Sequence, residues 1–185
     1  MSKKYLCQIL VLSGLLGIAH AQESPARHDA SFQLSVLDMR EDLGEKPLGV
    51  GGRFGYRLSS LLHLDGGLSY FPEDPSGNFG EVLGLGGVRV GKQFESIGVF
   101  AKARAGAIKF DGKAFSSRLS DKVHPAFDLG VMLEYYTRRS LFVRMDIGDC
   151  IIPFRDATYL SPYGETLSLG TKHYLLAEFG IGIRF

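Results

Sequence analysis

Hydrophobic and polar residues alternate along most of the chain after residue 30, and helical periodicity is nearly absent. Between Val99 and Ile108, for example, Val and Ala alternate with Phe, Lys, Arg and Gly. This period of two is typical of a β-strand that separates two environments, because successive side chains point to opposite faces. Eight segments show it, and the strands they predict are roughly 9 to 14 residues long, the length a tilted strand needs to cross a bilayer. The segments are 31–36, 48–58, 62–70, 83–90, 99–108, 127–135, 141–148 and 175–185.

One segment breaks the pattern. Leu83 and Leu85 are out of phase with Val88 and Val90, and two glycines lie between them. One extra residue in the strand would restore the phase. We therefore predict a β-bulge at Gly86 and Gly87.

Short and long connections alternate between the predicted strands. Tight turns are expected at Ser59-Ser60, at Glu95-Ser96 and at 137–139, and longer loops at 40–47, 72–81, 111–124 and 152–171. Short turns at one end and long loops at the other are typical of transmembrane barrels. The sequence thus predicts an all-β fold, an eight-stranded antiparallel up-and-down transmembrane β-barrel with both ends on the periplasmic side.

The two faces of the predicted strands differ in charge. One face is nearly uncharged, and the other carries Arg53, Arg57, Asp65, Arg89, Lys102, Arg104, Asp128, Glu134, Arg144, Asp146 and Glu178 among many glycines. A soluble barrel has its apolar face inside, so this distribution favours the reverse, with the charges in the interior. Because buried charges are costly unless paired, we expect a salt-bridged, closed interior, with Glu134 facing Arg144 across a hairpin. A gated polar conduit is the alternative.

Aromatic residues gather at both ends of the predicted strands. Those near the tight turns are Tyr56, Phe94, Tyr135, Tyr136 and Phe185, and those near the long loops are Tyr70, Phe71, Phe110, Phe127 and Tyr174. Two such belts are expected where a barrel wall meets the two membrane interfaces.

The first 21 residues have the pattern of a secretory signal peptide. Lys3 and Lys4 precede an apolar run over 6–18, and Ala19 and Ala21 supply the small residues of a cleavage site. A membrane anchor is the alternative, but the run is short for a membrane span. We expect three parts: a signal peptide (1–21), a short periplasmic segment (22–30) and an outer-membrane barrel (31–185).

The composition of the mature chain excludes several classes of function. Removing Lys3 and Lys4 leaves 19 basic against 20 acidic residues, without the basic stripe that nucleic-acid binding requires. Only Cys150 remains after cleavage, so no intrachain disulfide can form. We expect no cofactor and no metal site.

The last seven residues carry a family resemblance. Phe179, Ile181, Ile183 and Phe185 alternate with Gly and Arg up to a terminal Phe, which resembles the C-terminal signature of outer-membrane barrels. With the eight-strand pattern, the mature chain resembles the small OmpA/OmpX-like barrels. The resemblance implies an integral outer-membrane protein of a Gram-negative bacterium whose last strand is recognised by the barrel-assembly machinery. We expect a monomer in contact with outer-membrane lipid and lipopolysaccharide.

Enzymatic chemistry is the alternative to a structural or surface-interaction role. Some small barrels are lipid A deacylases with a His-x-Ser motif, and none of His28, His63, His124 or His173 has Ser two residues on. His63 and Asp65 could form an acid–base pair, although an interior hydrogen bond is favoured, and His173 fits an interfacial structural role. We therefore expect a non-enzymatic envelope protein that acts through four outer loops, with Phe154, Tyr159 and Tyr163 as contact aromatics. A lipid- or lipopolysaccharide-modifying enzyme and a narrow channel remain alternatives, and the loop ligand is not predicted.

Overall fold

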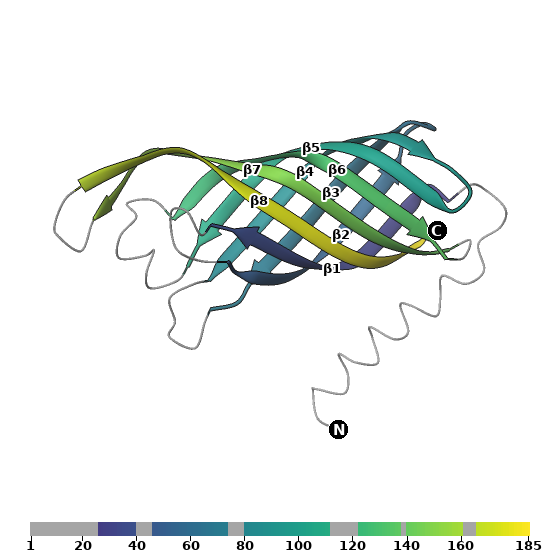
Figure 1. Cartoon of the computed structure of the whole chain (residues 1–185), viewed down its shortest axis with the longest axis horizontal. Helices are drawn as coiled ribbons and strands as arrows, with labels where there is room; N and C mark the ends of the chain where they lie inside the picture. The colour runs from purple at the N-terminus through teal and green to yellow at the C-terminus, as the bar shows by residue number, and fades with distance from the viewer. Residues whose placement is uncertain (1–25, 40–45, 74–79, 112–121, 138–139, 161–165) are drawn as a thin grey trace, which may run out of the picture.

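Eight antiparallel strands form a closed barrel in the computed structural model, which describes residues 26–39, 46–73, 80–111, 122–137, 140–160 and 166–185 and, of these, the side chains outside 155–169. Each strand pairs with its neighbour in sequence, and β8 pairs with β1 to close the barrel (Figure 1). The strands are β1 (His28–Asp38), β2 (Leu48–Arg57), β3 (Leu62–Phe71), β4 (Glu81–Gln93), β5 (Ile97–Phe110), β6 (Val123–Tyr136), β7 (Leu141–Leu160) and β8 (Thr166–Arg184). The predicted fold class is confirmed.

The barrel has two unlike ends. Residues 58–61, 94–96 and 137–140 make short connections at one end, here called the turn end, where β1 begins and β8 finishes. The other four connections join strands at the opposite end, here called the loop end. No helix in the described ranges is long and apolar enough to cross a membrane.

Several strands are longer than predicted, and two of the differences change which residues belong to the barrel. β1 begins at His28, so residues 28–30 belong to the barrel rather than to a separate segment. The prediction of a loop over 152–171 was wrong, because β7 and β8 stay paired up to Leu160 and Thr166, with a register shift between Phe154 and Thr158. This hairpin projects beyond the other strands at the loop end (Figure 1). The predicted signal peptide, with Ala19 and Ala21, lies outside the described residues.

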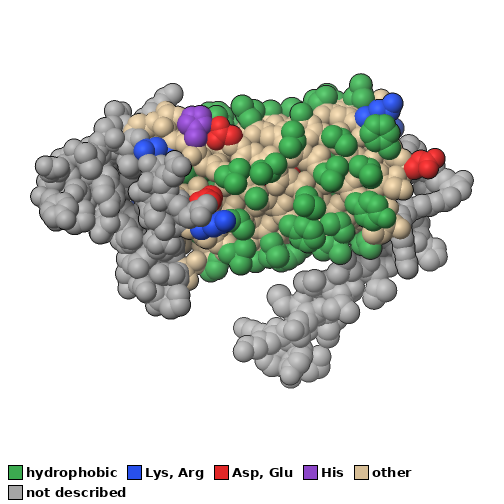
Figure 2. Space-filling view, viewed as in Figure 1, with side chains coloured by type: hydrophobic (Ala, Val, Ile, Leu, Met, Phe, Trp, Pro, Cys, Tyr) green, Lys and Arg blue, Asp and Glu red, His purple; other side chains and the backbone are tan. Residues whose placement is uncertain are grey.

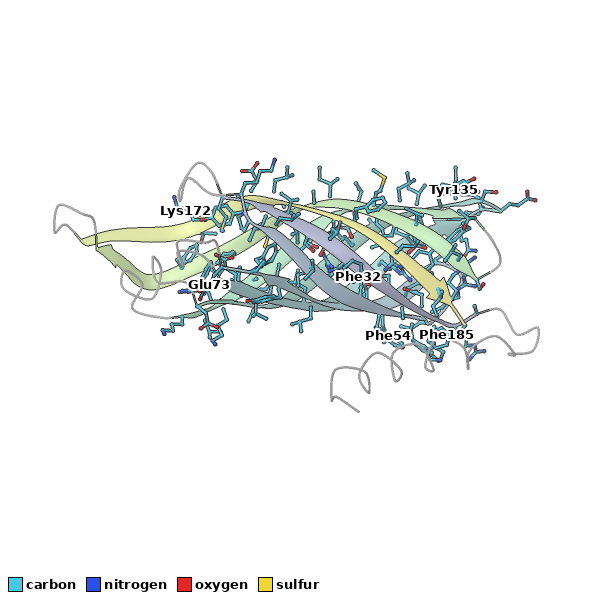
Figure 3. The ribbon with its side chains drawn as sticks, turned by 90° about the horizontal axis from the view of Figure 1, so that it is seen from below. Phe32, Phe54, Glu73, Tyr135, Lys172 and Phe185 are labelled. Carbon is cyan, nitrogen blue, oxygen red and sulfur yellow. The ribbon has the colours of Figure 1, made fainter. Side chains whose placement is uncertain are left out.

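The outer wall of the barrel is hydrophobic. Outward side chains such as Phe32 and Leu129 keep 55% and 53% of their surface exposed. Figure 2 shows hydrophobic side chains covering the middle of the barrel, with charged groups only near its two ends. Phe54 and Tyr135 lie at the edge of the barrel in Figure 3, pointing away from its axis. A soluble monomer rarely exposes so large an apolar surface, so this wall fits an apolar environment.

The aromatic belts are thinner than the sequence predicted. Tyr70 and Phe127 face outward at the loop end, but Phe71, Phe110 and Tyr174 are buried inside the barrel. Tyr136 is likewise buried at the turn end. The position of an aromatic residue at a strand end therefore does not show that it faces outward, because the alternation along the strand decides which way its side chain points.

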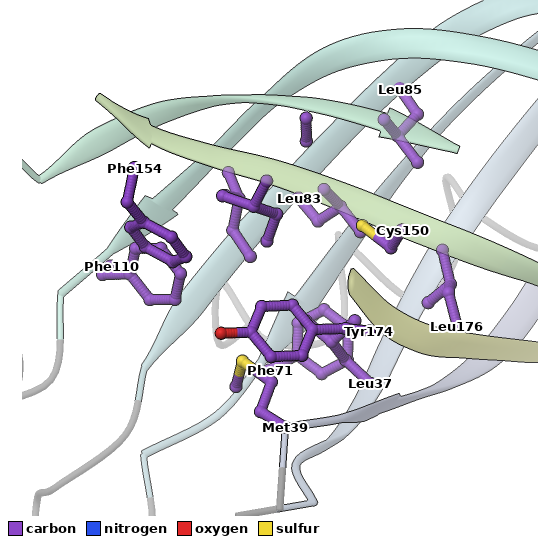
Figure 4. Close-up of a cluster of buried hydrophobic side chains, with 13 residues drawn as sticks. Leu37, Met39, Phe71, Leu83, Leu85, Phe110, Cys150, Phe154, Tyr174 and Leu176 are labelled. Carbon is purple, nitrogen blue, oxygen red and sulfur yellow. The ribbon is translucent and has the colours of Figure 1, made fainter. Parts of the chain in front are cut away.

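The predicted bulge in β4 was wrong for a related reason. The pairing of β4 with both β3 and β5 runs without a register shift, and Leu83 and Leu85 point inward in phase with Arg89. The inward face itself changes from charged to apolar toward the loop end. We call the resulting set the loop-end apolar cluster (Figure 4); it comprises Leu37, Met39, Phe71, Leu83, Leu85, Ile108, Phe110, Ala126, Cys150, Ile152, Phe154, Tyr174 and Leu176.

Substitutions at two adjacent glycines of β4 test how closely this strand packs inside the barrel. A methyl group on Gly87 would clash with the backbone of β5, at Ala103 O and 2.7 Å from Arg104 Cα, whereas one on Gly86 would meet only Asp65 O at 4.0 Å. Gly87→Ala should therefore lower the free energy of unfolding by about 1–3 kcal/mol. Gly86→Ala, the control, should change it by less than about 0.5 kcal/mol. Urea unfolding in lipid vesicles, followed by circular dichroism, measures both; equal effects would contradict this packing.

Candidate functional site: the barrel interior

Buried ionic side chains fill the barrel from its turn end to its middle. Two groups of contacts can be distinguished. The turn-end cluster consists of Asp29, Arg89, Glu134 and Arg144, and the central cluster of Arg53, Asp65, Lys102, Arg104, Asp128, Asp146 and Glu178. All eleven residues are buried. Beyond the central cluster lies the loop-end apolar cluster, with the buried side chains of Glu81 and His124 beside it.

The turn-end cluster is a closed ring of two arginines and two acids. Arg144 donates to Asp29 at 2.8 Å and to Glu134 at 2.5 Å. Arg89 binds the same two acids, reaching Glu134 at 2.5 Å. Glu134 lies directly opposite Arg144 across the β6–β7 hairpin, and Tyr136 donates to its second oxygen at 2.6 Å. Each charge in the ring therefore has two opposite charges beside it.

The central cluster is organised around Arg53. Its guanidinium donates to both oxygens of Asp65, at 2.8 and 2.5 Å, and also reaches Asp146. Such two-pronged contacts are the strongest form of a charged hydrogen bond. Arg53 thus joins β2 to its neighbour β3 and to β7 on the other side of the barrel.

Two further cations complete the central cluster. Lys102 lies 2.8 Å from Asp128 and 2.5 Å from Asp146. Arg104 lies 2.7 Å from both Asp128 and Glu178. Gln33 donates to the other oxygen of Glu178 at 2.8 Å, so neutral side chains satisfy part of the cluster.

Glycines opposite the long side chains give the network its space. Arg53 pairs in register with Gly67, Lys102 with Gly130, and Arg144 with Gly180. An interior of eight strands is only wide enough to be filled by side chains, so a large residue there needs a small neighbour. The alternation of Gly with Arg and Lys along the inward face therefore builds a filled interior.

The pairing of opposite charges offsets the cost of burying them in this interior. An ion moved from water to a protein interior loses several kcal/mol of solvation, which only close opposite charges and hydrogen bonds recover. The cavity at the turn end, among Arg57, Arg89, Tyr136 and Arg184, has about 10 Å³ of space, enough for about one water molecule.

The structure places ten of the eleven predicted interior residues inside the barrel, fully buried. Arg57 is only half-buried, at the turn end, where it donates to Gln93 at 2.6 Å. Sequence reasoning missed Asp29 because it started the barrel at residue 31. Asp29 continues the inward phase of Ser31 and Gln33, and this signal was present in the sequence.

The histidines occupy different surroundings from those considered for an enzyme. Both oxygens of Asp65 bind Arg53, while His63 packs edge-on against Phe100 with ring centroids 5.3 Å apart. An imidazole–carboxylate contact lies on the outer wall near the loop end, where His173 Nδ1 and Asp149 Oδ2 are 2.8 Å apart. The described part of the chain contains no group of three or more His, Cys, Asp or Glu suited to a metal ion.

The last strand forms the seam of the barrel. Phe179 and Ile181 face outward, each with 49% of its surface exposed, as the alternation of β8 requires. At the turn end the backbones of Phe185 and His28 exchange two hydrogen bonds of 2.9 Å, and their rings stack with centroids 5.7 Å apart. Recognition of Phe179, Ile181, Ile183 and Phe185 by an assembly machinery stays a prediction.

Replacing Arg53 tests whether the central cluster holds the barrel together. Arg53→Met leaves the carboxylates of Asp65 and Asp146 without their arginine, so the free energy of unfolding should fall by about 3–5 kcal/mol. Arg57→Met is the matched control on the same strand, because Arg57 is only half-buried; it should cost less than about 1 kcal/mol. Urea titration in lipid vesicles gives both values. A loss as small for Arg53 as for Arg57 would show that the central contacts do not stabilise the fold.

Comparison with known proteins bears on the fold alone. No protein-family model matches the chain, and no curated protein sequence matches it. Among solved structures, Neisserial surface protein A is 15% identical, with a TM-score of 0.52, covering 87% of this chain and 96% of that one. The N-terminal β-barrel domain of Pseudomonas aeruginosa OprF is 15% identical, with a TM-score of 0.54 over 86% of this chain and 99% of that one.

A third structure, the outer membrane protein OprG from Pseudomonas aeruginosa, is 9% identical, with a TM-score of 0.55 over 90% of this chain and 99% of that one. These similarities span nearly the whole length of each compared chain, so they compare one barrel with another. The chain has the fold of the small eight-stranded outer-membrane β-barrels.

Proposed function

We propose that the protein is an integral, non-enzymatic barrel of a bacterial outer membrane that presents its loop end to the cell surface. The observation that carries the proposal is the distribution of polar and apolar side chains, which is the reverse of that in a soluble barrel. Apolar side chains such as Phe32, Leu129 and Phe179 cover the outside, while ten of the predicted charges are buried inside. This arrangement suits a wall surrounded by lipid, and it supports the proposal that outer-membrane lipid and lipopolysaccharide contact the outer wall.

A filled interior supports a structural or surface role over a channel. Along the barrel axis an ion would first meet the turn-end cluster, then the central cluster and finally the loop-end apolar cluster. The side chains of Arg53, Lys102 and Asp128 are 0% exposed, so the middle of the barrel is closed to solvent. An ion could pass only if paired charges separated, and separating a buried pair costs several kcal/mol.

The loop end supports the idea that the protein interacts with partners there. The β7–β8 hairpin extends past the rest of the barrel, and binding residues of barrels are commonly carried on such extensions. Of the contact aromatics considered from the sequence, Phe154 is instead buried against Phe110 inside the barrel. The side chain of Tyr159 and all of Tyr163 lie outside the described part of the chain.

Polar pairs on the outer wall fit the boundary of a membrane at the loop end. Lys109 lies 2.7 Å from Asp111, and both are about half exposed. His173 and Asp149 form a second exposed pair. An enzyme that acts on lipids would use this second pair as an imidazole base and its orienting acid. We favour the non-enzymatic role because the buried polar side chains of the barrel are engaged with one another rather than directed into an open cleft.

Surface display can be tested with one epitope at two positions. An epitope inserted in the β3–β4 connection, between Gly77 and Asn78, should be labelled by antibody on intact cells, because that connection lies at the loop end. The same epitope between Glu95 and Ser96, in the β4–β5 turn, should be labelled only after the outer membrane is permeabilised. Both variants should fractionate with the outer membrane. Labelling of the turn position on intact cells, or recovery in the soluble fraction, would overturn the proposal.

A further inference from the structure

The cavity at the turn end is lined by more basic than acidic side chains. Its arginines are Arg27, Arg57, Arg89 and Arg184, and its acids are Asp29 and Glu134. Both acids belong to the turn-end cluster, where each already binds two arginines. The turn-end cluster has two bases and two acids, and the central cluster has three bases and four acids. Adding Arg27, Arg57 and Arg184 gives these groups eight bases against six acids, and the surplus of positive charge lies at the cavity.

Three of the arginines come from neighbouring strands beside the seam of the barrel. Arg184 of β8 pairs in register with Asp29 of β1. The backbone N–H of Arg57, at the end of β2, donates to the carbonyl oxygen of Arg27 at 2.7 Å. Arg27 directly precedes β1 and is exposed, while Arg57 and Arg184 are half-buried. A small anion that enters the cavity therefore meets basic side chains from three adjacent parts of the sheet.

Neutral side chains hold two of these arginines in place. Arg57 Nη2 donates to Gln93 Oε1 at 2.6 Å. The guanidinium carbon of Arg184 lies 3.9 Å from the centre of the Tyr136 ring. A guanidinium carries five N–H donors, and neither of these two contacts neutralises its charge. Positive groups that line one small cavity repel one another, and an anion placed between them replaces this repulsion with attraction.

Arg89 gives an independent indication that the cavity takes a hydrogen-bond acceptor. Its side chain is 2% exposed, and its two terminal nitrogens donate to Glu134 and Asp29. Its Nε is buried and has no hydrogen-bond partner among the described residues. A buried donor without an acceptor is costly, so an oxygen atom in the cavity that Arg89 lines would stabilise the barrel.

We propose that the turn-end cavity binds an oxyanion, a phosphate or carboxylate group, between Arg27, Arg57 and Arg184. Guanidinium groups match the oxygen atoms of such groups with paired hydrogen bonds, and they stay charged over the whole physiological pH range. The cavity has about 10 Å³ of space, so it admits the charged end of a ligand while the rest of the ligand stays outside the barrel.

This inference rests on the proposed function only for the compartment in which the ligand is found, because that proposal places the turn end in the periplasm. Binding to the isolated protein does not depend on the direction in which the barrel is inserted. A failure to bind anions and a failure of surface display are therefore separate results.

Anion titration of the folded, full-length mature protein in octyl glucoside micelles, which contain no phosphate, tests the proposal. Calorimetry at low salt gives the dissociation constants of inorganic phosphate and of acetate, and the wild type should bind at least one of them. Arg57→Gln and Arg184→Gln should each raise that constant at least about tenfold, because each loses a charged hydrogen bond. Lys92→Gln is the matched control: Lys92 is exposed, lies over Phe94 near the same end and does not line the cavity. It should change the constant by less than about threefold.

Two results would overturn the proposal. The first is a wild type that binds neither anion. The second is an equal loss of affinity in Lys92→Gln and Arg57→Gln, which would mean that the anion responds only to the net charge of the protein. The titration is then repeated in vesicles with and without phosphatidylglycerol to identify the source of the anion. Weaker phosphate binding in the presence of this lipid would support the site with a lipid headgroup as its ligand, and unchanged binding would support it with a soluble anion.

Discussion

The pairing of charges inside a narrow barrel is the constraint on which the rest of this structure depends. Because the outer wall consists of Leu, Val, Phe and Ala, the polar side chains of the strands point inward. Eight strands enclose too little space for water to solvate these side chains. Each charge must therefore find an opposite charge from another strand. Arg53 shows the consequence, because a single guanidinium from β2 reaches Asp65 on β3 and Asp146 on β7.

The interior has two zones with different physical roles. Toward the turn end and the middle, paired ions hold specific strands in specific positions, because a one-residue slip would turn every inward charge toward the outside. Toward the loop end the packing is mostly apolar, with Phe71, Phe110, Phe154 and Tyr174 near the buried Glu81 and His124. The first zone specifies register, and the second excludes water from the side of the network that faces the loops. Together they fill the interior, which is why we propose the loop end as the place where the protein meets partners.

The period of two made the fold and most of the ionic network predictable from the sequence. The pairing of Glu134 with Arg144 could be predicted from the sequence, because the two residues lie almost equally far from the same turn. Asp29 could not be found once the barrel was taken to begin at residue 31. Leu83 and Leu85 were misassigned because an apolar residue was assumed to face outward, and only packing across the barrel shows that the interior becomes apolar there. The contacts of Arg53 with β7 join strands far apart in sequence, which no local pattern can indicate.

The interaction energy between Arg53 and Asp65 tests the account most directly. A double-mutant cycle would combine Arg53→Gln and Asp65→Asn, with the free energy of unfolding of all four proteins measured by urea titration in lipid vesicles. If buried pairs hold the barrel closed, the coupling energy should exceed about 1.5 kcal/mol. Effects of the two substitutions that add within about 0.5 kcal/mol would show that the two groups do not interact in the folded protein, and would contradict the account.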